Sequence, residues 1–115
     1  GTEHVANELY PEMDKLFEHF GYSNMHMGTV EGNFSIESFL DELKNFHPDH
    51  IHLAPFMIVA GDHATNDMSG EDDDSWKSIL EKEGYSVKCT LKGLGEIQAI
   101  RDIFIRHTRA GLDRL

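Results

Sequence analysis

Cysteine is almost absent from this chain, and proline, tryptophan and long apolar runs are also scarce. Cys89 is the only cysteine, so no disulfide can form within the chain, which fits a reducing compartment. No apolar run approaches the ~20 residues that a membrane-spanning helix needs, and no secretory signal opens the sequence. We therefore expect a cytoplasmic protein with no membrane partner.

Basic side chains are also few, with 10 lysines and arginines against 21 aspartates and glutamates, a net charge of −11. Because an acidic surface repels phosphate backbones, we expect no nucleic-acid partner. No nucleotide site is expected either, because the sequence has no Walker-type lysine loop. Its segment Gly93-Leu94-Gly95-Glu96 also lacks the third glycine of a dinucleotide loop. With 39% hydrophobic residues, the 115-residue chain can form a core and is not a disordered protein.

Hydrophobic spacing predicts four helices that alternate with three strands. The predicted helices cover 5–20, 35–46, 71–83 and the residues after Glu96, and the predicted strands cover 25–30, 51–60 and 85–91. This order predicts an α/β fold, an open parallel sheet flanked by helices, in one domain over residues 1–115. Because the first helix has no strand before it, the first strand of the sheet is expected to be missing.

The segment 51–60 is the most apolar part of the chain and lies between Pro48 and Gly61. Such a continuous apolar run is typical of a parallel strand that is covered on both faces. Pro55 lies inside the run and has no backbone N–H for a sheet hydrogen bond. We therefore expect a bulge there, or a strand that pairs fully on one side.

Three polar residues fall where the predicted strands end. Glu31 closes the strand 25–30, His63 follows the strand 51–60, and His4 precedes the first helix, where the missing strand would end. Ligands of open parallel sheets bind outside the carboxyl ends of the strands, so we expect these side chains to converge. Two imidazoles and a carboxylate suit cobalt, nickel or zinc, and could equally transfer protons near neutral pH. Each could instead cap a helix or form a structural hydrogen bond.

Other acidic groups have simpler interpretations. Glu96 lies at the same sheet edge, but a carboxylate in the first turn of a helix is stabilised there by the helix dipole. The acidic run 71–74 lacks the alternating ligands and the glycine of a calcium loop, and it precedes a predicted helix. We therefore expect helix-start roles for both.

The remaining histidines are also expected to be surface or packing residues. His50 and His52 would share one face of a strand, with His47 nearby, but they lie at the beginning of that strand, away from the ligand edge. His19, His26 and His107 are isolated from other histidines in the sequence. Cys89 is expected to be a small buried residue in a strand.

Several motifs along the chain resemble one known family. These are Gly1-Thr2-Glu3-His4, Gly28-Thr29-Val30-Glu31, the segment Val59-Ala60-Gly61-Asp62-His63-Ala64 with Asn66-Asp67-Met68, Asp74-Ser75-Trp76-Lys77 and Gly93-Leu94-Gly95-Glu96. In this order they resemble the C-terminal half of the anaerobic sirohydrochlorin cobaltochelatases, which are class II chelatases. The likeness spans essentially the whole chain.

The resemblance implies a chelatase-like half, similar to a flavodoxin-like domain, of a larger two-lobed lyase. It implies that Co²⁺ is inserted into sirohydrochlorin or a related tetrapyrrole without ATP, as in cobalamin or sirohaem biosynthesis, with Fe²⁺, Ni²⁺ or Zn²⁺ as other possible metals. By motif, the family's catalytic and metal residues correspond to His4, Glu31 and His63. The implied partners are the tetrapyrrole and a missing N-terminal half, or a second copy through self-association.

The substrate implied by the resemblance carries many carboxylates, which an acidic chain repels. Lys88, Lys92 and Arg101 are candidates to offset this charge. Two other functions stay open: a carrier that binds a metal or a haem-like tetrapyrrole without turnover, and an interaction domain without a site. Conversion of sirohydrochlorin in the presence of Co²⁺ would separate the enzyme from both.

Overall fold

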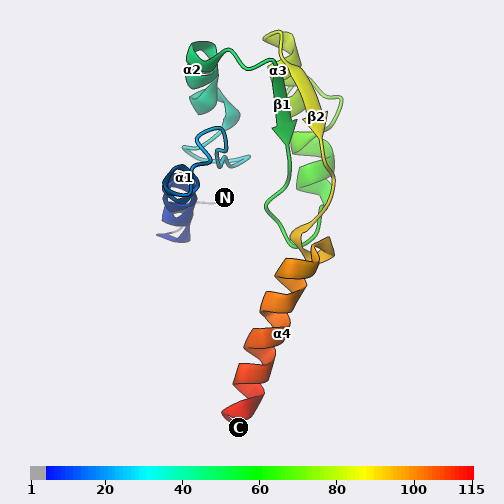
Figure 1. The fold of residues 1–115 in the computed structure, drawn as a ribbon. Helices are drawn as coiled ribbons and strands as arrows, with labels where there is room; N and C mark the ends of the chain where they lie inside the picture. The colour runs from blue at the N-terminus through cyan, green and yellow to red at the C-terminus, as the bar shows by residue number, and fades with distance from the viewer. Residues whose placement is uncertain (1–4) are drawn as a thin grey trace. The chain divides into compact units, whose positions relative to one another are not determined.

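The computed structural model describes residues 5–115 (Figure 1). Backbone contacts divide the chain into two compact units, Gly1–Pro48 and Asp49–Leu115, here called unit 1 and unit 2. His4, one of the predicted site residues, lies outside the described residues. None of the helices in the described range is long and apolar enough to cross a lipid bilayer.

Unit 1 contains two helices that follow a short 3-10 turn. The turn η1 covers Val5–Glu8, α1 covers Leu9–His19, and α2 covers Ile36–Phe46. The first helix ends at His19, inside the predicted range 5–20, and Gly21 follows it with a φ of 87° that favours a residue without a side chain. Ile36 is buried on α2, whereas Leu9 and Leu16 of α1 are exposed.

The predicted strand 25–30 is wrong. Its backbone N–H groups bond within unit 1 instead: that of Met25 to the Tyr22 carbonyl, that of Met27 to the Asp14 carboxylate, and that of Thr29 to the Phe34 carbonyl. In a strand, a neighbouring strand accepts these hydrogen bonds. Here the acceptors are backbone carbonyls in nearby turns and one carboxylate side chain. The segment is therefore an irregular connection between α1 and α2.

Unit 2 contains the parallel sheet, and this part of the predicted fold class is confirmed. Strand β1 covers His50–Leu53 and β2 covers Ser86–Cys89, and the two pair in parallel with His50 opposite Ser86 and Leu53 opposite Cys89. Helix α3, Trp76–Lys82, connects them and packs on β2, with Leu80 fully buried. This βα unit is the core of unit 2.

Two further helical segments lie at the carboxyl ends of the strands. The π-helical segment η2 covers His63–Met68, and the 3-10 turn η3 covers Leu94–Glu96 and leads into α4, Gln98–Asp113. The apolar residues Ile103, Phe104 and Ile105 of α4 are exposed, and the packing of α4 within unit 2 concentrates at η3 (Figure 1). Hydrophobic spacing did not predict η2, because this segment is polar.

The strand predicted over 51–60 is much shorter than expected. It ends at Leu53, two residues before Pro55, and the chain then forms a loop up to Asp62. The carbonyls of Met57 and Ile58 accept hydrogen bonds from η3 rather than from a strand. A continuous apolar run can therefore form a loop that packs on a neighbouring turn as well as a strand in a sheet. Hydrophobic periodicity does not distinguish these two structures.

Candidate functional site

The carboxyl ends of β1 and β2 lie side by side because the two strands are parallel. The Thr90 N–H donates to the Leu53 carbonyl at 2.9 Å, which continues the pairing one step beyond Cys89. The loops that follow the two strands therefore leave the sheet at the same edge. This is the edge at which open parallel sheets bind their ligands.

The loop after β1 is held by backbone contacts with η3. Leu94 N–H donates to the Met57 carbonyl at 2.7 Å, and Gly95 N–H donates to the Ile58 carbonyl at 3.0 Å. A Cβ atom at Gly93 would lie 2.4 Å from the Ile58 carbonyl oxygen, so this approach requires glycine. The contacts fix the course of the chain that leads to His63.

His63 is the first residue of η2, and its imidazole is paired with a carboxylate. Its Nδ1 atom lies 2.6 Å from Oδ2 of Asp67, four residues further along the segment. An ionised carboxylate can only accept hydrogen bonds, so this contact suits an imidazole that donates through Nδ1. The His63 side chain is 68% exposed, which leaves Nε2 open to a ligand.

The backbone of η2 is anchored beneath this pair. Ala64 and Met68 are 1% and 7% exposed, so they attach one side of the segment to the core of unit 2. The Ser69 hydroxyl donates to the Ala64 carbonyl at 2.9 Å and closes the end of η2. Short π-helical segments are rare in proteins and are frequently found at functional sites.

Glu31 lies in a tight loop of unit 1. The loop is closed by the Thr29 N–H, which donates to the Phe34 carbonyl at 2.8 Å, and the buried Thr29 hydroxyl donates to the Glu31 carbonyl at 2.6 Å. These bonds hold the backbone of Glu31, while its side chain is exposed. The carboxylate is therefore presented on a rigid turn.

The structure describes the predicted site residues separately. Glu31 belongs to unit 1 and His63 to unit 2, each described within its own unit, and His4 is outside the described range. Within residues 5–115, no three histidine, cysteine, aspartate or glutamate side chains form a group that could hold a metal ion. A site made by His4, Glu31 and His63 together stays a prediction.

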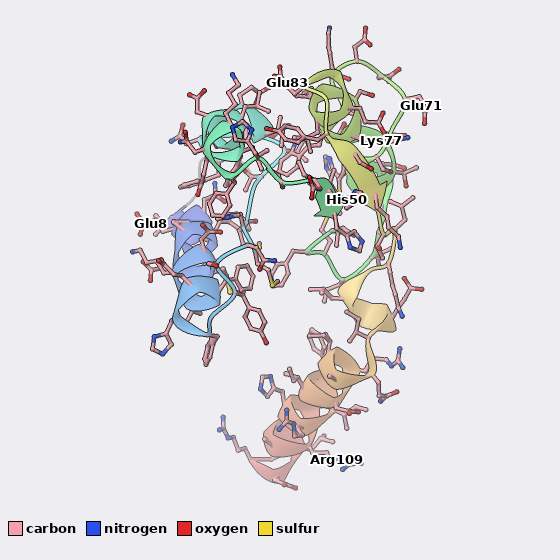
Figure 2. All side chains as sticks on the ribbon, turned by 45° about the horizontal axis from the view of Figure 1, so that its top comes forward. Glu8, His50, Glu71, Lys77, Glu83 and Arg109 are labelled. Carbon is pink, nitrogen blue, oxygen red and sulfur yellow. The ribbon has the colours of Figure 1, made fainter. Side chains whose placement is uncertain are left out.

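The helix-start role expected for Glu96 is confirmed. Its Oε2 atom accepts a hydrogen bond from the Gly93 N–H at 3.0 Å, which caps the turn η3. The helix predicted over 71–83 begins only at Trp76, and its first turn contains no acidic residue, so the acidic run 71–74 lies before the helix and its expected helix-start role is not confirmed. Glu71 instead forms an ion pair with Lys77 at 3.1 Å (Figure 2). Both features stabilise local structure.

The histidines of β1 are exposed, as expected. His50 begins the strand (Figure 2), and His52 Nε2 lies 2.6 Å from the Thr90 hydroxyl. His52 therefore links the two strands by a side-chain hydrogen bond. Cys89 of β2 is half-buried, and this burial raises the pKa of its thiol.

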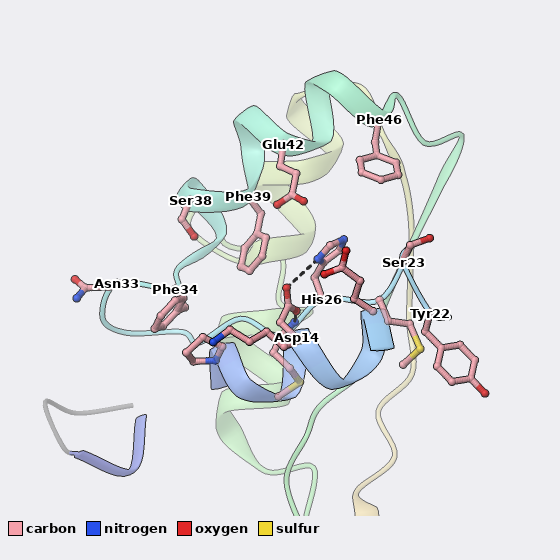
Figure 3. A pocket seen from close by; sticks show the side chains of 15 residues that line it. Asp14, Tyr22, Ser23, His26, Asn33, Phe34, Ser38, Phe39, Glu42 and Phe46 are labelled. Carbon is pink, nitrogen blue, oxygen red and sulfur yellow. Dashed lines mark hydrogen bonds and ion pairs between the residues drawn. The ribbon is translucent and has the colours of Figure 1, made fainter. Parts of the chain in front are cut away.

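The structure contains one cluster that the sequence did not predict. His26, which was expected to be isolated, has partners in unit 1. Its Nδ1 atom lies 3.2 Å from Oδ2 of Asp14, and its ring contacts the rings of Phe39 and Phe46 (Figure 3). Asp14 also accepts the Met27 N–H at 2.7 Å through Oδ1. The sequence carries no local signal for this pair, because its members are separated by 12 residues and meet only when the chain returns along α1.

A cavity of about 590 Å³ in unit 1 surrounds His26 (Figure 3). Its walls combine phenylalanine and methionine side chains with the carboxylates of Asp14, Glu18 and Glu42 and the ammonium of Lys15. The carboxylates outnumber the ammonium, so the charged groups that line the cavity are mainly negative.

A protein-family model described as cobalt chelatase (CbiK) matches residues 1–113. The chain belongs to this family. The family resemblance carried by the motifs around His4, Glu31 and His63 is thereby confirmed, and the Asp67 that pairs with His63 lies in the most specific of these motifs.

Two curated relatives of this cobalt chelatase family member are named as sirohydrochlorin cobaltochelatases. The chain is 35% identical over 113 residues to "Sirohydrochlorin cobaltochelatase" of Salmonella typhimurium strain LT2, a match of 98% of this chain and 42% of the relative. It is 34% identical over 115 residues to "Sirohydrochlorin cobaltochelatase CbiKC" of Nitratidesulfovibrio vulgaris strain Hildenborough, a match of 100% of this chain and 40% of the relative. The chain thus spans about two fifths of the length of these relatives.

Proposed function

We propose that the chain is the C-terminal part of a sirohydrochlorin cobaltochelatase, a lyase that inserts Co²⁺ into the tetrapyrrole. The observation that carries this proposal is the His63–Asp67 pair, which leaves Nε2 of an exposed imidazole free at the ligand edge of the sheet. Membership of the cobalt chelatase family and the names of both relatives support the metal and the substrate.

In this proposal, insertion requires the removal of water from Co²⁺ and of two protons from the pyrrole nitrogens. Nε2 of His63 binds the incoming Co²⁺ or accepts a pyrrole proton, since a neutral imidazole can do either near neutral pH. The Glu31 carboxylate and the His4 imidazole complete the metal-handling group, with a coordination position left for the macrocycle. Cobalt is the substrate here, and no nucleotide takes part.

The substrate carboxylates need cations near the ligand edge of unit 2. Lys92 lies in the loop after β2, and it is exposed. The Arg101 guanidinium donates to the Gly95 carbonyl at 3.1 Å and to the Gln98 side chain at 2.7 Å, so it is held beside η3. Lys88 lies within β2, before the edge. We therefore favour Lys92 and Arg101 as the groups that attract the substrate.

Co²⁺ insertion by a His63→Ala variant tests the proposal. The change in the visible absorption of sirohydrochlorin under anaerobic conditions measures the rate, and His107→Ala provides a control histidine on the exposed surface of α4. We expect a loss of about 100-fold or more for His63→Ala, the contribution typical of a positioned proton acceptor, and no change for the control. A near-normal rate in His63→Ala contradicts the assignment. Stoichiometric Co²⁺ binding without insertion by the unmodified protein would instead support a carrier.

A further inference from the structure

The Asp67 side chain has a role that the sequence motifs alone do not assign. We propose that Asp67 is a positioning residue: it holds His63 in the Nδ1–H tautomer and fixes the ring so that Nε2 is the atom offered to the metal substrate. This inference rests on the proposed function, because it specifies how one of the proposed metal-handling groups is prepared. Its basis is the 2.6 Å distance between His63 Nδ1 and Asp67 Oδ2.

A neutral imidazole has one N–H and one lone pair, and only the lone pair can bind a metal or accept a proton. The hydrogen bond made by one ring nitrogen determines which of the two nitrogens carries the proton. Asp67 supplies an acceptor at Nδ1, so the proton stays there and the lone pair is at Nε2. A carboxylate behind a metal-binding imidazole recurs in metalloproteins, where it fixes the tautomer and the ring orientation.

The surrounding backbone holds Asp67 in place before any metal arrives. A Cβ atom at Gly70 would lie 2.4 Å from the Asn66 carbonyl oxygen, and the Gly70 N–H donates to that oxygen at 3.1 Å. The next residue after Asp67, Met68, is buried. The segment therefore cannot shift easily, and the hydrogen bond to His63 is preorganised.

The pair is also accessible enough to act. The Asp67 side chain is 43% exposed and the His63 side chain 68% exposed, so solvent reaches both groups. Asp62 offers a comparison, because it precedes His63 directly, is exposed, and forms no side-chain cap of η2. Replacement of Asp62 removes a charge near the ring and leaves the contact with Nδ1 intact.

Nitrogen-15 spectra of the His63 ring in the metal-free protein report the tautomer directly. The unmodified protein is expected to show the Nδ1–H form. Asp67→Ala is expected to populate the Nε2–H form, whereas Asp67→Glu keeps the Nδ1–H form because it retains a carboxylate acceptor. The same variants are then titrated with Co²⁺, followed by its visible absorption. We expect about 10- to 100-fold weaker binding for Asp67→Ala, and part of the affinity to be restored in Asp67→Glu.

Asp62→Ala is the matched control and is expected to change neither the tautomer nor the Co²⁺ affinity. The inference is overturned if Asp67→Ala keeps the Nδ1–H form, or if its Co²⁺ affinity equals that of the unmodified protein. Equal losses in Asp67→Ala and Asp67→Glu would also overturn it. A failure of the proposed function shows differently, because the unmodified protein would then not insert Co²⁺ into sirohydrochlorin, while the metal-free spectra still report the Asp67 contact.

Discussion

Gly93 lies directly against the backbone of Ile58, in a contact that has no room for a side chain. A Cβ atom at position 93 would be 2.4 Å from the Ile58 carbonyl oxygen and 2.8 Å from Cα of Val59. The next two residues donate hydrogen bonds to Met57 and Ile58. The turn η3 thus holds the loop between β1 and His63, which couples two loops at the proposed ligand edge.

A Gly93→Ala substitution is therefore expected to lower the free energy of unfolding by about 1–3 kcal/mol, the usual cost of forcing an extra carbon into a packed site. Gly111→Ala is the control, because no atom lies within 4 Å of a Cβ at that helical position. This control should gain up to about 1 kcal/mol from the higher helix propensity of alanine. Urea unfolding measures both, and equal stability of the two variants would contradict the contact.

The Ser75 side chain is fully buried at the start of α3. Its hydroxyl accepts the Ser78 N–H at 3.1 Å and lies 2.7 Å from the Gly70 carbonyl, to which it donates. We expect Ser75→Ala to cost about 2 kcal/mol, because a helix cap is lost and a carbonyl loses its partner. Thermal unfolding followed by circular dichroism measures this loss.

Ser35→Ala is the matched control for the cap. Ser35 occupies the same position before α2, but its side chain makes no hydrogen bond to the helix backbone. We expect it to cost about 0.5 kcal/mol or less. A loss as large as that of Ser75→Ala would show that the buried hydrogen bonds are not the cause.

Asp14 attaches the segment after α1 to the helix. Its two carboxylate oxygens lie 2.7 Å from the Met27 nitrogen and 3.2 Å from His26 Nδ1. We expect Asp14→Ala to destabilise the protein by about 1–3 kcal/mol, because a part-buried N–H loses its acceptor, and to increase hydrogen exchange of the Met27 amide. Glu12→Ala removes a neighbouring exposed carboxylate that pairs with Lys15, and no faster exchange at Met27 is expected.

The Cys89 thiol provides a test that depends on pH. Burial raises its pKa, nearby Lys77 lowers it in part, and Glu81 adds to the rise. Because the thiolate is the reactive form, iodoacetamide should modify the folded chain more slowly than the urea-unfolded chain at about pH 8. The folded chain holds this proton more tightly, so its contribution to stability is present below the unfolded pKa and is lost as the pH rises through the folded pKa. Equal alkylation rates in both states would contradict the shift.

Local features of the sequence determined where several helices begin and end. Gly21 and Gly84 follow α1 and α3 with φ values of 87° and 97°, as helix-stop residues do, and Ser35 precedes α2 as expected of a helix-start residue. The predicted start of α3, residue 71, is too early, because the helix begins at Trp76. The parallel arrangement was also predictable, because strands that alternate with helices pair in parallel. These features depend on neighbours in the chain, so the sequence alone was sufficient.

Tertiary contacts decided the rest, because a strand or an ion pair needs a partner from elsewhere in the chain. The run 51–60 stops being a strand at Leu53, since its later carbonyls bond to η3. His26 meets Asp14 only through the return of the chain along α1. The motif identified His63 as a candidate, but only the folded η2 segment showed that the Asp67 carboxylate lies 2.6 Å from its Nδ1 atom.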